Sequence, residues 1–176
     1  MTSFDDFVKK QNEKTKSAQA FDPQERIDIF KKHVEEFYNS VCNEWLKDNI
    51  DKGLIITKRQ LIQVYEESLG MYDIDALDIH IGSIVINLRP IGTILIGTRG
   101  RIDISYRSRN GMFVLTGENI ESPSAHIVIS VNGEKPSKQK DPGREVWKFV
   151  DRRGMMSYVS LNTEVFQQII MGLING

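Results

Sequence analysis

Arg101 and Asp103, with Glu118 further along the chain, come closest in this sequence to a catalytic pattern. Arg101 and Asp103 alternate with apolar residues, and Glu118 follows the next apolar segment. Metal-dependent nucleases of the restriction type pair an Asp on one strand with an acidic-x-Lys pattern on the next. Glu118 is followed by Asn-Ile and lacks that lysine. We therefore expect Arg101 and Asp103 to lie on the solvent side of a strand, as an ion pair or as part of a binding surface.

Two glycine spacings within residues 92–100 resemble phosphate-binding patterns only in part. Gly92 and Gly97-Thr98 have the spacing of a phosphate loop, but the lysine that this loop requires before Ser or Thr is missing. Gly97 and Gly100 have the GxxG spacing that KH domains place between two helices, whereas the flanking residues here predict strands. A tight turn or a bulge is the simpler interpretation.

Potential metal ligands are dispersed along the chain. The acidic residues of segment 73–80 divide between the two faces of a predicted strand, where charge also discourages edge-to-edge aggregation. The histidines and the single cysteine are far apart: His33, His80, His126 and Cys42. The sequence predicts no catalytic residue, no metal site and no cofactor, although a composite site from distant residues stays an open hypothesis.

Basic residues are concentrated in the second half of the chain, whereas segment 66–78 carries acidic residues and no Lys or Arg. The two basic loops, 99–109 and 135–153, predict a surface for an acidic protein or a phosphate backbone. Aromatic residues suited to base stacking are few nearby. The candidate binding residues are Arg99, Arg101, Asp103, Arg107, Arg109, Arg152 and Arg153.

Composition is that of an ordinary globular protein. The chain has 176 residues, a formal net charge of −1 and 40% hydrophobic residues, which excludes a protein that is basic throughout. The first residues are polar and charged, with no apolar signal segment. Apolar runs are too short to cross a bilayer. These features predict a cytoplasmic protein that does not enter a membrane.

The helices have recognisable start signals. Asp22 followed by Pro23 predicts a helix N-terminus, and apolar residues then recur every three or four positions to about Leu46. Asn162 is expected to cap a final helix with a broad apolar face. Residues 1–20 are predicted to be a polar helical or flexible arm, and residues 21–176 a single domain.

The middle of the chain predicts strands. Segment 54–57 favours a strand, and segment 60–68 is open between helix and strand. A hairpin turn is predicted at 108–111, because Asn-Gly accepts the positive φ angles of a type I′ turn. The further strands are predicted at 72–81, 84–90, 93–96, 101–107, 112–116, 126–131, 146–150 and 156–161. The fold class is therefore α+β, with a long N-terminal helix, a mostly antiparallel twisted sheet or partly closed barrel of about six to eight strands, and a C-terminal helix.

Function is predicted from the two ends of the chain. Phe4 and Phe7 form a short apolar stripe, and Phe166 and Ile170 belong to the apolar terminal helix; all four are candidate partner-docking residues. We expect a non-enzymatic protein-interaction module, such as an accessory or immunity-type subunit of a larger intracellular assembly, with a protein partner or a homo-oligomer. The alternatives are a nucleic-acid-binding module that uses the two basic loops, and an enzyme with a composite site.

Overall fold

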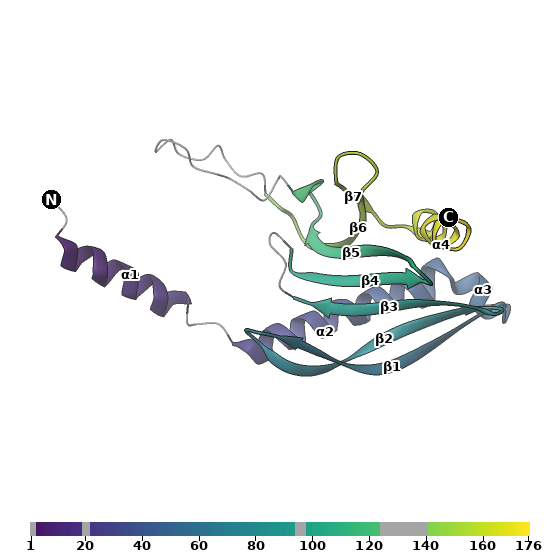
Figure 1. Cartoon of the computed structure of the whole chain (residues 1–176), viewed down its shortest axis with the longest axis horizontal. Helices are drawn as coiled ribbons and strands as arrows, with labels where there is room; N and C mark the ends of the chain where they lie inside the picture. The colour runs from purple at the N-terminus through teal and green to yellow at the C-terminus, as the bar shows by residue number, and fades with distance from the viewer. Residues whose placement is uncertain (1–2, 19–21, 94–97, 124–140) are drawn as a thin grey trace.

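The computed structural model describes residues 3–18, 22–93, 98–123 and 141–176 (Figure 1). The helical elements are α1 (Phe4–Ala18), α2 (Pro23–Ser40), the π-helical turn η1 (Val41–Trp45), α3 (Lys47–Asp51) and α4 (Thr163–Asn175). The strands are β1 (Ile55–Glu66), β2 (Gly70–Ile81), β3 (Ile84–Gly92), β4 (Gly100–Tyr106), β5 (Arg109–Gly117), β6 (Glu145–Asp151) and β7 (Ser157–Ser160). This arrangement confirms the predicted α+β class.

The strands form one seven-stranded antiparallel sheet in which each strand pairs with the next along the chain. The sheet is open, with β1 and β7 at its edges, so the partly closed barrel is not formed. Segment 60–68 belongs to β1 up to Glu66. The predicted strands 93–96 and 126–131 fall, apart from Thr93, outside the described residues.

Helix α2 lies across one face of the sheet (Figure 1) and supplies much of the core. The Asp22 carboxylate accepts a hydrogen bond from the Gln24 amide at 2.9 Å, as a capping residue should. After Ser40 the helical run continues through the π-helical turn η1. Aromatic rings from α2 and the sheet pack together: the ring centroids of Phe37, on α2, and Phe113, on β5, lie 4.9 Å apart. The buried residues of α2 are Ile27, Phe30, Val34, Phe37 and Tyr38.

The β1–β2 hairpin extends beyond the rest of the sheet. Strand β2 pairs with β3 only from Leu77 onward, whereas its pairing with β1 continues to Gly70. The Tyr38 hydroxyl donates to the Asp75 carbonyl at 2.9 Å, next to the point where β3 leaves β2. Ala76 and Leu77 are both buried although neighbouring strand residues point to opposite faces. The buried side of β2 therefore changes there, as the hairpin twists (Figure 1).

The predicted turn at 108–111 is wrong in its position. Tyr106 pairs with Arg109, so the turn consists of Arg107 and Ser108, and Arg107 has a φ of 54°. Gly111 pairs with Ile104 inside the ladder. A Cβ atom on Gly111 would lie 2.8 Å from the Phe149 ring, so packing, rather than turn geometry, requires glycine at this position.

The C-terminal helix α4 begins as predicted. The Asn162 side-chain oxygen accepts a hydrogen bond from the Val165 amide at 2.8 Å, and Phe166 packs against Trp45 with ring centroids 4.9 Å apart. Helix α4 therefore completes the core of this chain. Among the described residues, no helix is long and apolar enough to cross a membrane.

Candidate functional site

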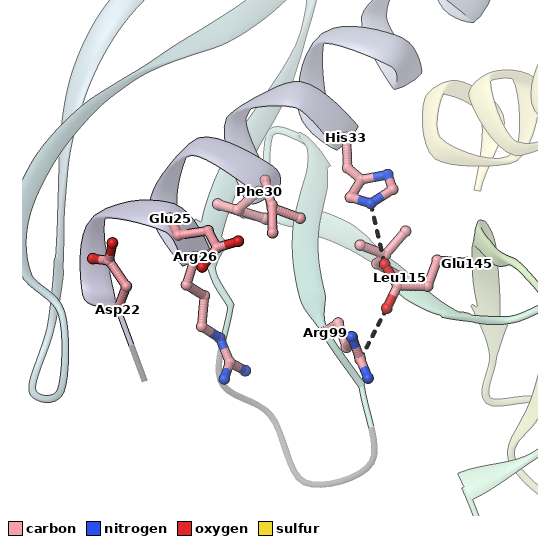
Figure 2. A pocket seen from close by; sticks show the side chains of 9 residues that line it. Asp22, Glu25, Arg26, Phe30, His33, Arg99, Leu115 and Glu145 are labelled. Atoms are coloured by element: carbon pink, nitrogen blue, oxygen red, sulfur yellow. Dashed lines mark ion pairs between the residues drawn. The ribbon is translucent and has the colours of Figure 1, made fainter. Parts of the chain in front are cut away.

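A cavity of about 350 Å³ opens between the start of α2 and the sheet (Figure 2). The first turns of α2 contribute Glu25 and Arg26, the residue before β4 contributes Arg99, and the first residue of β6 contributes Glu145. Phe30 and Leu115 line the apolar part of the cavity. The cavity therefore combines acidic, basic and apolar groups that come from four separate parts of the chain.

His33 lies between two carboxylates at this cavity. Its Nδ1 atom is 3.2 Å from Glu36 Oε2, and its Nε2 atom is 3.1 Å from Glu145 Oε2. Figure 2 shows His33 and Arg99 on either side of Glu145, and Arg99 Nε lies 2.9 Å from Glu145 Oε1. Both ring nitrogens donate to carboxylates when the imidazole is protonated. The arrangement leaves neither nitrogen for a substrate, so it favours a structural link between α2 and β6 over general-base catalysis.

A second link holds the same parts of the molecule together. The indole Nε1 of Trp147, on β6, donates to the His33 carbonyl at 2.9 Å. A neighbouring cavity of about 430 Å³ shares Arg26, Arg99 and Glu145 with the first and extends to Gly143. Two contacts, from Glu145 and from Trp147, therefore join β6 to α2 beside these cavities.

The predicted ion pair between Arg101 and Asp103 is present. Arg101 Nη2 donates to Asp103 Oδ2 at 2.8 Å, and Arg101 Nε donates to the other carboxylate oxygen. Both side chains are 29% exposed. The Arg101 guanidinium is therefore largely occupied within its own chain. Arg99, two residues earlier, is far more accessible, at 75% exposed.

The remaining candidate arginines lie elsewhere. Arg107 lies over the Tyr106 ring at the far end of β4, about 20 Å from Arg101 at the usual rise per strand residue. Arg109 Nη1 donates to the carbonyls of Leu173 and Ile174 at 3.0 and 2.8 Å, which satisfies the C-terminal end of α4.

In the connection after β6, Arg153 pairs with Asp151 at 3.0 Å and is 92% exposed; Arg152, its neighbour, is also exposed. Arg109 and Arg153 line one cavity of about 630 Å³ beside α4. The structure therefore does not gather the seven candidate residues into one surface.

The two predicted basic loops do approach one another at the start of β6. The Glu118 amide donates to the Arg144 carbonyl at 2.9 Å, and the Arg99 amide donates to the Leu115 carbonyl at 2.9 Å, on the paired strand. The Arg144 side chain is 80% exposed. Among the described residues, Arg99 and Arg144 are thus two exposed cations at the neighbouring ends of β4 and β6. Most of loop 135–153 before Arg144 lies outside the described residues.

Helix α1 carries an apolar stripe that no other described part of the chain covers. Phe4 is 78% exposed, Phe7 is 55% exposed and Val8 is 39% exposed. The two phenyl rings stack on one another with centroids 6.4 Å apart. In Figure 1, α1 stands apart from the sheet and from the other helices. Phe166 and Ile170 differ: they are 0% and 5% exposed, so they belong to the core of this chain and are no longer docking candidates.

Comparison of the chain with protein-family models, with curated proteins and with solved structures gave no significant match. Within the described residues, no group of three or more His, Cys, Asp or Glu side chains is placed to hold a metal ion.

Sequence reasoning missed one exposed apolar surface, on the β1–β2 hairpin. Leu61 is 67% exposed, Tyr65 is 69% exposed and Met71, which pairs with Tyr65, is 63% exposed. These residues share one face of the hairpin. Leu61 and Tyr65 are four positions apart and therefore share one face of a strand. The helix-like capping pattern before them left the segment open between helix and strand.

Proposed function

We propose that this chain is a non-enzymatic protein-interaction module, an accessory subunit that joins a larger assembly through helix α1. The observation that supports this most strongly is the exposure of Phe4 and Phe7 on a helix that stands apart from the domain. Burying a side chain of this size contributes about 1.5–3 kcal/mol. An isolated helix of 15 residues is only marginally stable in water. A partner that covers the stripe supplies the missing burial.

The spacing of the stripe indicates the mode of binding. Phe4, Phe7 and Val8 are related by three and four residues, so they project from one side of the helix. This is the pattern of an amphipathic helix that lies in an apolar groove of another protein. Asp5 and Asp6 occupy the adjoining faces in the first turn. We expect the partner to offer an apolar groove with a polar rim.

The cavity beside α2 supports the non-enzymatic part of the proposal. Each nitrogen of His33 faces a carboxylate, so the imidazole is already occupied by contacts within the chain. Arg99 and Glu145 are likewise paired with one another. Glu145 thus contacts both His33 and Arg99 within the chain.

Quantitative affinity purification of the full chain from its native cells tests the proposal. The F4S/F7S double variant removes the stripe, and the matched K9S/K10S variant changes two exposed positions of the same helix. We expect a stoichiometric partner with the unmodified chain and with K9S/K10S, and its loss with F4S/F7S. Equal recovery from the two double variants, or no stoichiometric partner at all, contradicts the proposal. Because α1 stands apart from the domain core, F4S/F7S should leave the thermal unfolding of the domain unchanged.

A further inference from the structure

Strand β1 is a long edge strand without the usual protection. It has 12 residues, and no strand pairs with its outer side among the described residues. The opposite edge, β7, has only four residues. Soluble proteins keep exposed edges short, or break them with proline, bulges and outward-pointing charges. β7 follows this rule, whereas β1 contains neither proline nor glycine and pairs with β2 without a register shift.

Charge protects this edge poorly. Lys58 and Arg59 are the basic residues of β1, but Arg59 is held toward α2, where its two terminal nitrogens lie 2.6 and 2.9 Å from the Glu35 carboxylate oxygens. Lys58 remains as an exposed basic residue of β1 that can discourage pairing with another strand. Ile56, Leu61 and Tyr65 are 56%, 67% and 69% exposed. Unpaired backbone and exposed apolar side chains therefore occur along the same strand.

We propose that β1 pairs antiparallel with β1 of a second copy of this chain, on a two-fold axis at Leu61. The axis then lies near the middle of the strand, so almost its whole length is paired. Leu61 faces the same residue of the second copy. Strand addition of this kind satisfies the unpaired backbone groups of both edges at once.

This register is self-complementary in charge. Counting outward from Leu61, Arg59 faces Gln63 and Lys58 faces Val64 of the second copy. In this register no two like charges stand directly opposite one another. Directly opposed like charges would destabilise an antiparallel pair. Tyr65 faces Thr57, and aromatic and β-branched side chains are a favourable cross-strand combination. These matches favour a second copy over an unrelated strand as the occupant of the edge.

The inference is independent of the proposed function, because α1 takes no part in the pairing. Sedimentation equilibrium of the full chain tests it. We expect the unmodified chain to dimerise reversibly, and L61K to raise the dissociation constant of the dimer at least about tenfold. The control M155K adds the same charge at a side chain that is 93% exposed and outside the strands, and should not change dimerisation. F4S/F7S should also dimerise normally.

Cross-linking tests the register. In a C42S background, which removes the single native cysteine, L61C places two cysteines opposite one another at the two-fold axis, within disulfide range. I56C places them ten strand positions apart, about 33 Å. We expect mild oxidation to give a covalent dimer with L61C and none with I56C. A strictly monomeric unmodified chain, or a dimer in which L61C does not cross-link faster than I56C, overturns the proposal.

Discussion

Glu66 and Thr93 are joined by two hydrogen bonds although 27 residues separate them. The Glu66 carboxylate accepts from the Thr93 amide and from the Thr93 hydroxyl, both at 2.9 Å, and from the Tyr72 hydroxyl as well. Glu66 is only 9% exposed. A Cβ atom on Gly92 would lie 2.8 Å from the Glu66 carboxyl carbon. The contact holds the tip of the β1–β2 hairpin against the end of β3, beyond the point where β2 and β3 stop pairing.

We predict that E66Q destabilises the domain by about 1–3 kcal/mol. The donors from Tyr72 and Thr93 now share two carboxylate oxygens, whereas a glutamine side chain offers them only one acceptor oxygen. The control E67Q changes the exposed neighbouring residue and should have little effect. Urea unfolding monitored by circular dichroism measures the difference. Equal urea midpoints for E66Q and E67Q would show that the contact of Glu66 with Thr93 and Tyr72 contributes nothing to stability.

Burial, together with hydrogen bonding to Glu66, raises the pKa of Tyr72 above its usual range, so E66Q should lower that pKa.

The close packing of Gly111 and Phe149 gives a second prediction. G111A should destabilise the domain by about 1–3 kcal/mol, because the added methyl group has no space beside the ring. Replacing the Phe149 ring by the smaller leucine side chain restores the space. G111A should therefore lower the free energy of unfolding much less in an F149L background than in the unmodified chain. A double-mutant cycle of thermal unfolding measures this coupling. Strict additivity of the two changes would contradict the packing explanation. G172A, whose Cβ meets nothing within 4 Å, is the matched control.

Lys148 is a buried cation, 3% exposed, on β6. Its ammonium group donates to the carbonyls of Glu118 and Ile120 at 2.7 and 2.8 Å. We predict that K148M destabilises the domain by about 1–3 kcal/mol at neutral pH, because these two carbonyls lose their donor. K58M, at an exposed lysine, serves as the control, and chemical denaturation is the measurement. A K148M protein as stable as K58M would show that burial of the charge costs as much as its hydrogen bonds provide.

The same lysine predicts a pH dependence. Burial lowers the pKa of Lys148 from its ordinary value of 10.5. The unfolded chain then binds more protons than the folded chain as the pH rises toward 10.5, so Lys148 adds stability over that interval. We expect the stability difference between the unmodified chain and K148M to widen with rising pH up to about that value. Unfolding free energies measured at several alkaline pH values check this, and a constant or shrinking difference contradicts it.

The nucleic-acid alternative makes its own prediction from the placement of the arginines. Arg99 and Arg144 directly precede β4 and β6 and are largely exposed, whereas Arg109 donates hydrogen bonds to the C-terminal end of α4. Polynucleotide binding, if this alternative holds, should weaken with R99Q/R144Q and show a shallower salt dependence. R107Q should leave it unchanged. Fluorescence anisotropy over a salt series measures both effects, and an absence of salt-dependent binding eliminates the alternative.

The fold was largely predictable because local signals agreed with the tertiary structure. Asp22 and Asn162 cap the helices that their positions predict. Alternating apolar residues identified most of the described strands. The turn between β4 and β5 was misplaced because the Asn-Gly pair is a local signal, whereas the space beside Phe149 that requires Gly111 is set by a strand distant in sequence.

The candidate sites were less predictable, for a related reason. Phe4 and Phe166 both occur in apolar helical patterns, yet one is 78% exposed and the other fully buried. Amphipathic spacing predicts which face seeks burial, but not whether the partner is the same chain. The joining of His33, Glu145 and Arg99 depends in the same way on contacts between distant segments.

Photo-cross-linking from position 7 in native cells tests most directly whether α1 docks in a groove of another protein. A photoreactive amino acid replaces Phe7 in one variant and Met155, which is 93% exposed outside the helices and strands, in the other. We predict that position 7 cross-links to one partner protein in high yield, and that position 155 does not. Indiscriminate cross-linking at both positions, or none at position 7, would contradict the role assigned to α1.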